Sequence, residues 1–190
     1  MIPYKIYLAV FSILITSVNF LSAEIFTSKE HGFVVNLPGK AESLKMNNAL
    51  GKMVSHGVFD EKKTLVYQVI IQDMRHRKEF QNLTEVQTKT ALKTNFDAYV
   101  KETDTKDVKS SWSKLVTWST IEFACRHEGF FSEGQTTYKR GYSFLHNGLW
   151  FKLTVHGLKD DKELESSARD FMASFSFVDQ ETATKIEETK

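Results

Sequence analysis

Residues 136–157, TTYKRGYSFLHNGLWFKLTVHG, contain the strongest fold signal in the chain. Two runs rich in aromatic and aliphatic residues flank Asn147-Gly148, and this dipeptide favours a two-residue type I′ turn, which needs positive φ at both central positions. A two-residue loop also fixes the register of the two strands. The predicted cross-strand pairs are His146 with Leu149, Phe144 with Phe151, Tyr142 with Leu153, and Arg140 with Val155.

The two faces of this predicted hairpin differ in polarity. One face carries six apolar or aromatic side chains and is predicted to be core: Tyr138, Tyr142, Phe144, Phe151, Leu153 and Val155. The other face has Leu145 and Trp150 near the turn, and Ser143 opposite Lys152 further along. Because this second face is apolar only near the turn, we expect it to be covered only in part.

Two helices and several further strands surround the hairpin in the sequence. Alternating apolar residues predict a strand within residues 31–39 that ends at the Pro38-Gly39 turn. Further strands are predicted over residues 43–46, 52–59, 64–72, 112–119 and 121–131. One amphipathic helix is predicted over residues 83–101, with Asn82 and Glu85 as its capping pair. Asp160 and Glu163 are expected to cap a second helix, whose apolar face is Leu164, Ala168, Phe171, Met172 and Phe175. A short last strand is predicted at 175–177, and residues 103–111 are expected to be a charged loop.

Strands grouped in runs, instead of alternating singly with helices, indicate an α+β fold. We expect a mostly antiparallel β-sheet flanked by two main helices. The length of 190 residues, with 41% hydrophobic and 26% charged residues, fits one globular domain. The 25 basic and 24 acidic residues give a formal net charge of +1, which gives no indication of a nucleic-acid partner.

The N-terminus has the pattern of a secretory signal peptide. Lys5 precedes a mostly apolar run over residues 6–21, and Ala23 is the best cleavage residue. The run is shorter than the roughly 20 residues of a membrane span, so we expect cleavage, a secreted or periplasmic protein, and no stable membrane insertion afterwards. The alternative is a retained anchor. The predicted organisation is a signal peptide over 1–23, a single α+β domain over 24–178 and a polar tail over 179–190.

Three stretches resemble the PsbP/Mog1-like superfamily of small exported α+β proteins. They are GFVVNLPG at residues 32–39, LWFKLTVHG at 149–157 and FMASFSF at 171–177. The superfamily includes photosystem accessory proteins and a factor that binds a small GTPase. The resemblance therefore implies a binding or accessory module, not an enzyme. No functional residue of either branch matches a residue of this sequence.

Arg140 and His127 are the two candidate binding residues. Arg140 is predicted on the apolar hairpin face, where an unpaired charge would be costly. It could pair with a carboxylate, stack on a tyrosine, anchor an anionic ligand, or extend its head to solvent. His127 is predicted to share a strand face with Cys125, the only cysteine, which excludes an intramolecular disulfide. A buried Cys125 and a hydrogen-bonded His127 are favoured over a nucleophile–base pair, because no third orienting group is evident.

No catalytic, metal-binding or cofactor-binding constellation is present in the sequence. It contains no Gly-rich phosphate loop, HExxH, GxSxG or paired-carboxylate motif. His76 lies in a basic run at residues 74–78, for which a solvated loop is favoured over an anion or partner site. We therefore expect an exported soluble binding or accessory protein, whose ligand is an unknown protein or small molecule. The alternatives are a hydrolase or other enzyme with a dispersed site around Arg140 and His127, and a membrane-tethered interaction protein if the signal is uncleaved.

Overall fold

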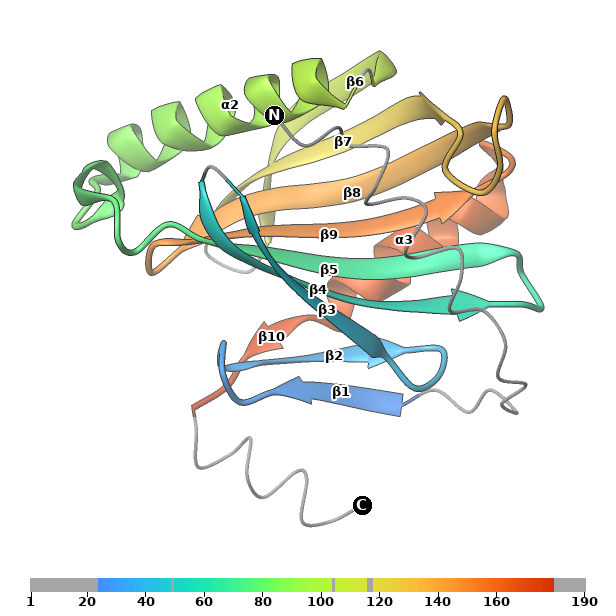
Figure 1. The fold of residues 1–190 in the computed structure, drawn as a ribbon, viewed down its shortest axis with the longest axis horizontal. Helices are drawn as coiled ribbons and strands as arrows, with labels where there is room; N and C mark the ends of the chain where they lie inside the picture. Colours follow the sequence, from blue (N-terminus) through green and yellow to red (C-terminus); the bar gives the residue numbers. More distant parts are fainter. Residues whose placement is uncertain (1–23, 49, 104, 116–117, 180–190) are drawn as a thin grey trace.

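Two antiparallel sheets and two helices form the fold in the computed structural model, which describes residues 24–48, 50–103, 105–115 and 118–179 (Figure 1). The larger sheet has the strand order β3-β4-β5-β9-β8-β7-β6. Its strands are β3 (Glu42–Asn48), β4 (Gly51–Asp60), β5 (Leu65–Asp73), β6 (Lys106–Leu115), β7 (Trp118–Glu128), β8 (Thr136–His146) and β9 (Leu149–Gly157). The smaller sheet, of order β1-β2-β10, contains β1 (Glu24–Ser28), β2 (Phe33–Leu37) and β10 (Ser176–Phe177).

The larger sheet separates two hydrophobic cores. Helix α2 (Glu85–Glu102) packs against β7 and β8 on one face, and helix α3 (Lys162–Ala173) packs against β8, β9 and β2 on the other (Figure 1). The smaller sheet lies on the α3 side, where its residues share a core with Phe144, Phe151 and Leu153. The α2 side has its own core, built around Phe96, Phe123 and Trp150. We call these two sides the α3 face and the α2 face. The predicted α+β class is confirmed.

The central hairpin forms as predicted. Asn147 and Gly148 both have positive φ, at 48° and 71°, as a type I′ turn requires. The observed pairs include Phe144 with Phe151 and Arg140 with Val155, which is the predicted register. The predicted core face of the hairpin lies on the α3 face, with Phe144, Phe151, Leu153 and Val155 fully buried and Tyr138 and Tyr142 partly buried.

The expectation that the second hairpin face is covered only in part is wrong. Its polar side chains are buried: Lys139, Ser143, Lys152, Thr154 and His156. Helix α2 covers this face through Tyr99, and Phe130 stacks on His156 with ring centroids 4.0 Å apart. The covering groups come from segments distant in the chain, so the alternation within the hairpin contains no sign of them.

Residues 106–111, predicted as part of a charged loop, belong to strand β6. The strand pairs with β7 from Lys106 opposite Arg126 to Leu115 opposite Trp118. It is one of the two edge strands of the larger sheet and most of its described side chains are exposed, so its sequence shows no alternation of apolar residues. Backbone pairing with β7, not side-chain burial, defines this strand.

The N-caps of both helices lie one or two residues after the predicted ones. The N-cap of α2 is Thr84, not Asn82: its side chain accepts a hydrogen bond from the backbone N–H of Gln87, whose side-chain oxygen accepts from the Thr84 N–H. The N-cap of α3 is Asp161, which accepts from the N–H groups of Glu163 and Leu164. Asn82 instead has a left-handed backbone with φ 54°.

Within the described part of the chain, no helix combines the length and apolarity needed to cross a membrane. The predicted signal peptide at 1–23 lies outside the described residues, as does the predicted tail beyond residue 179.

Candidate functional site

A cleft of about 470 Å³ lies where the β8–β9 turn meets the loop before α2 and the first turns of that helix. We call it the hairpin cleft. Its apolar lining is Phe80, Leu83 and Leu145. Its polar lining is Arg75, Gln81, Asn82, Thr88, His146 and Asn147, and Gly148 completes the wall. A concave site with apolar walls and a few convergent polar groups is the usual form of a small-molecule site.

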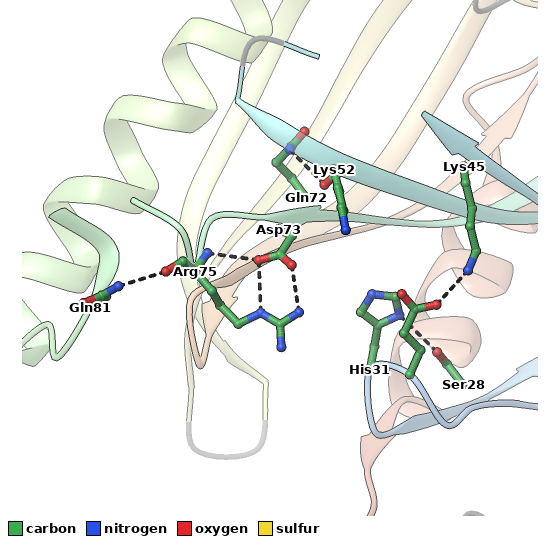
Figure 2. A network of polar contacts seen from close by, with 9 residues as sticks. Ser28, His31, Lys45, Lys52, Gln72, Asp73, Arg75 and Gln81 are labelled. Carbon is green, nitrogen blue, oxygen red and sulfur yellow. Dashed lines mark hydrogen bonds and ion pairs between the residues drawn. The ribbon is translucent and has the colours of Figure 1, made fainter. Parts of the chain in front are cut away.

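Backbone contacts hold the loop against the hairpin turn. The Met74 N–H donates to the Gly148 carbonyl at 2.9 Å, which joins the end of β5 to the turn. A Cβ on Gly148 would lie 2.9 Å from Arg75 Cγ. Glycine is therefore favoured at this position for two reasons, the close approach of Arg75 and the positive φ. The Gln81 side chain donates to the Arg75 carbonyl at 2.9 Å (Figure 2). The walls of the hairpin cleft are therefore tied to each other.

Arg75, the only cation among the cleft residues, is paired with a carboxylate. Its guanidinium donates to both oxygens of Asp73, from Nε to Oδ1 at 3.0 Å and from Nη2 to Oδ2 at 2.7 Å (Figure 2). These hydrogen bonds lower the pKa of Asp73 to about 2, so the carboxylate stays charged at neutral pH. The pair leaves this wall of the cleft close to neutral.

His146 is the second titratable group of the cleft, and burial lowers its pKa below the ordinary value. Its ring stacks on Phe177 at 3.9 Å and meets the edge of Trp118 at 5.3 Å. Its Nε2 lies 3.1 Å from the side-chain nitrogen of Asn147. The His146 imidazole is therefore neutral at neutral pH. The polar lining of the cleft then consists of amides, one hydroxyl, this imidazole and an arginine whose charge is paired.

A second group of polar contacts connects the smaller sheet to β3. Lys45 Nζ lies 2.8 Å from Glu30 Oε2, and the Ser28 hydroxyl lies 3.2 Å from His31 Nδ1 (Figure 2). Lys45 and Glu30 are both well exposed, so their ion pair is of the weakly stabilising surface kind. This group therefore joins the β1–β2 turn to β3 and lies apart from the residues of the hairpin cleft.

Arg140 pairs with carboxylates, one of the four arrangements that its position allows. Its Nη2 lies 2.9 Å from Asp160 Oδ1 and 3.9 Å from Glu165 Oε2, so it joins β8 to the start of α3. His127 points to the other face of the sheet: Ala124 is opposite Arg140, whereas His127 is opposite Thr137. The structure therefore does not bring these two predicted site residues together.

Cys125 and His76 also occupy structural positions. Cys125 is buried in the α2-face core, and burial raises the pKa of its thiol, which opposes thiolate formation. His76 packs against the β3–β4 turn, where a Cβ on Gly51 would lie 2.5 Å from His76 Cε1. In the basic run, Arg75 pairs with Asp73 and Arg77 with Glu79. The run thus offers little uncompensated charge.

The sequence does not point to the hairpin cleft because its lining comes from three separate segments. Asn147 and Gly148 were recognised as a turn, and Asn82 as a helix cap. One feature of the sequence does relate to the cleft: asparagine adopts positive φ more readily than most residues, so it often marks turns and loops. Asn82 at φ 54° and Asn147 at φ 48° both line the cleft.

No protein-family model matches this sequence, and no curated protein matches it. A crystal structure from Bacteroides thetaiotaomicron is similar at TM-score 0.50 and 15% identity, over 82% of this chain and 48% of that one. The present chain thus spans about half of that protein's length.

Two further structures are similar to this chain. Cyanobacterial PsbP from Synechocystis sp. PCC 6803 has TM-score 0.49 and 12% identity, over 85% of this chain and 95% of that one. LpqN of Mycobacterium tuberculosis, described as involved in cell envelope biogenesis, has TM-score 0.38 and 10% identity, over 84% and 92% of the two chains. The predicted PsbP/Mog1-like resemblance is confirmed as a resemblance of fold, and at these identities nothing finer follows.

Proposed function

We propose that this protein is an exported binding module that holds an uncharged, hydroxyl-rich ligand, such as a short oligosaccharide, in the hairpin cleft. The observation that carries the proposal is the lining of the cleft, which combines neutral polar groups with the apolar Phe80, Leu83 and Leu145. Small-molecule sites are usually concave and mostly preformed, with a few polar groups that fix orientation. The backbone ties between loop and turn supply such a preformed shape.

The chemistry of the lining matches that of a sugar. The side-chain amides of Asn82 and Asn147 each offer donors and an acceptor, and the Thr88 hydroxyl offers both. A sugar hydroxyl is likewise both donor and acceptor, and the C–H face of a pyranose ring is apolar enough to lie against Phe80. The neutral His146 imidazole adds a further group that can serve as donor or acceptor.

An anionic ligand is less well matched to this cleft. A buried or partly buried anion needs a cation or several N–H donors to replace its hydration. Asp73 already occupies the guanidinium of Arg75 through two hydrogen bonds. A ligand carboxylate would have to displace Asp73 and leave that carboxylate without its partner.

Export is the second part of the proposal, and the apolar run at residues 6–21 followed by Ala23 supports it. We expect the mature chain to begin at Glu24. N-terminal sequencing of the protein from the cell envelope and the culture medium measures this directly. A chain that still begins at Met1 in the membrane fraction would favour the tethered interaction protein instead.

Calorimetric titration of the purified protein with neutral trisaccharides (maltotriose, cellotriose and chitotriose) tests ligand binding. The variants Asn82→Gly and Asn147→Gly remove an amide from the cleft but keep a residue that tolerates positive φ. Each should weaken binding about fivefold, the effect of losing roughly 1 kcal/mol of hydrogen bonding. Thr64→Gly is the matched control, because Thr64 also has positive φ, at 54°, but lies in the β4–β5 turn. Equal affinity in all four proteins, or binding of acidic sugars only, would overturn the proposal.

A further inference from the structure

Two lysines are buried on the α2 face, outside the hairpin cleft. Lys139 on β8 is 6% exposed and Lys152 on β9 is 4% exposed. Within the described residues, no salt bridge involves either of them. Buried lysines are rare in proteins, and those that occur are generally paired or lose their charge. These two side chains therefore need a physical account.

Lys139 is held as a cation by a hydrogen bond. Its Nζ donates to the hydroxyl oxygen of Tyr99 at 2.7 Å. Burial opposes the charge, whereas Tyr99 favours it, and the pKa of Lys139 stays above the ordinary value. The face consequently contains one fixed positive charge beside Lys152.

Lys152 is enclosed by aromatic rings. Its Nζ lies 4.0 Å from the centre of the Tyr99 ring and 4.5 Å from that of Trp150. Burial, and after it the positive charge of Lys139, lower the pKa of Lys152 to about 7, although Glu102 acts in the opposite direction. At neutral pH a large fraction of the Lys152 side chains is therefore the neutral, nucleophilic amine.

The approach to Lys152 is most open on the β5 side. Lys152 is paired with Ile70 of β5, and Ile70 and the neighbouring Gln68 are partly exposed. Helix α2 packs over β7 and β8, on the other side of the lysine. Lys152 itself is 4% exposed, so a small molecule would have to reach the amine from this side, beside Ile70 and Gln68.

We propose that Lys152 is a reactive amine that forms a Schiff base with a small carbonyl compound, an aldehyde or a ketone. The neutral Nζ attacks the carbonyl carbon, and the C=O π electrons move to the oxygen, which takes a proton to give a carbinolamine. Loss of that oxygen as water and of the second N–H proton gives the imine, so one water is released for each adduct. Lysines activated by desolvation beside a second cation are an established class of amine nucleophile.

The two rings would stabilise the protonated product. Protonation of the imine gives an iminium cation at the position of Nζ, directly over the faces of Tyr99 and Trp150. Aromatic faces attract cations, most strongly at desolvated sites. This inference is independent of the ligand of the hairpin cleft.

Reductive trapping tests it on the purified full-length protein. The protein is incubated at pH 7 with propionaldehyde and cyanoborohydride, and peptide mass mapping follows the propylation of each lysine with time. The exposed Lys40 and Lys62 serve as internal controls. An ordinary lysine is neutral in fewer than about one molecule in a thousand at this pH, so Lys152 should react at least about tenfold faster, even with restricted access.

The Lys139→Met variant sharpens the test, because removing the neighbouring cation should raise the pKa of Lys152 and slow its propylation several-fold. The variant is used only if its circular dichroism spectrum matches the wild type; otherwise the wild-type rates alone decide. Propylation of Lys152 at or below the rate of Lys40 and Lys62 would overturn the proposal.

Discussion

The α3 face and the α2 face of the same sheet are built from different chemistry. On the α3 face, phenylalanine rings form a continuous cluster: Phe33, Phe144, Phe151, Phe175 and Phe177 contact one another with centroids 5.2–6.3 Å apart. On the α2 face, Lys139, Lys152 and His156 are buried among aromatic rings. Strands β8 and β9 each contribute to both faces. The comparison indicates that the α3 face stabilises the fold, whereas the α2 face, which also borders the hairpin cleft, holds the groups capable of chemistry.

The largest expected effect is on the α3 face. Phe151→Ala removes a fully buried ring that contacts Phe33, Phe144 and Phe175, and should lower the free energy of unfolding by about 3–5 kcal/mol. Urea denaturation measures the loss. Val86→Ala, at a 75% exposed position of α2, is the control and should change stability by less than about 0.5 kcal/mol. A loss below about 1 kcal/mol for Phe151→Ala would contradict the role assigned to this face.

Replacing the buried amine should act in the opposite direction. Lys152→Met keeps most of the side-chain volume and removes a group that is costly to bury, so it should raise stability by about 1–3 kcal/mol at pH 6. The folded pKa is about 7 and the unfolded value about 10.5, so the unfolded chain binds more protons between these limits. The free-energy cost of burying the Lys152 ammonium is thus fully present below about pH 7 and disappears as the pH rises towards 10.5.

Denaturation of both proteins at pH 6, 8 and 10 measures this dependence. The advantage of Lys152→Met should shrink steadily as pH rises. A variant that is less stable than the wild type at every pH would show that the ammonium stabilises the fold, contrary to the comparison of the two faces.

His56 should make the α3 face sensitive to acid. It is buried against Phe26, its Nδ1 lies 2.7 Å from the Ser43 hydroxyl, and burial lowers its pKa to about 4. Stability linked to this histidine is fully present above pH 6.5 and is lost as pH falls towards 4. Between pH 7 and pH 4 the wild type should lose on the order of 1–2 kcal/mol more than His56→Leu. Parallel stability profiles of the two proteins over this range would exclude the linkage.

The smallest effect is expected from the ion pair at the edge of the α3 face. Asp160→Asn weakens the partly exposed Arg140–Asp160 pair and should cost less than about 1 kcal/mol, with a smaller cost in high salt. Thermal denaturation at low and high salt provides the measurement. Trisaccharide affinity should not change, and a change of more than about threefold would return Arg140 to the candidate binding residues.

The local parts of the fold were predictable from sequence because their signals are local. Asn147-Gly148 determines both a turn and a register, and the pairing of Phe144 with Phe151 followed from it. The amphipathic helix over residues 83–101 was likewise predicted, and helix α2 buries Leu92, Phe96 and Tyr99 on one side. In these cases the spacing of apolar residues in the sequence matches the repeat of the strand or the helix that they form.

The candidate sites depend on contacts between distant segments, which no local pattern contains. Lys152 lies between the apolar residues Phe151 and Leu153, so the alternation of the strand predicts that it faces solvent. In the structure the Tyr99 ring of helix α2 lies against it. Asn82 resembles a helix cap, yet Thr84 takes that role and Asn82 lines the cleft beside Asn147. The fold class thus followed from the sequence, whereas the cleft and the buried amine required the assembled sheet.

The central claim, that ligand binding belongs to the hairpin cleft and not to the α3 face, is tested most directly by chemical-shift mapping. Backbone 15N–1H spectra of the purified protein would be recorded during titration with each of the three neutral trisaccharides. We expect one of them to shift the signals of Asn82, Asn147 and Gly148 while those of α3 stay unchanged. Shifts confined to α3 and the smaller sheet, or none with any of the three sugars, would contradict it.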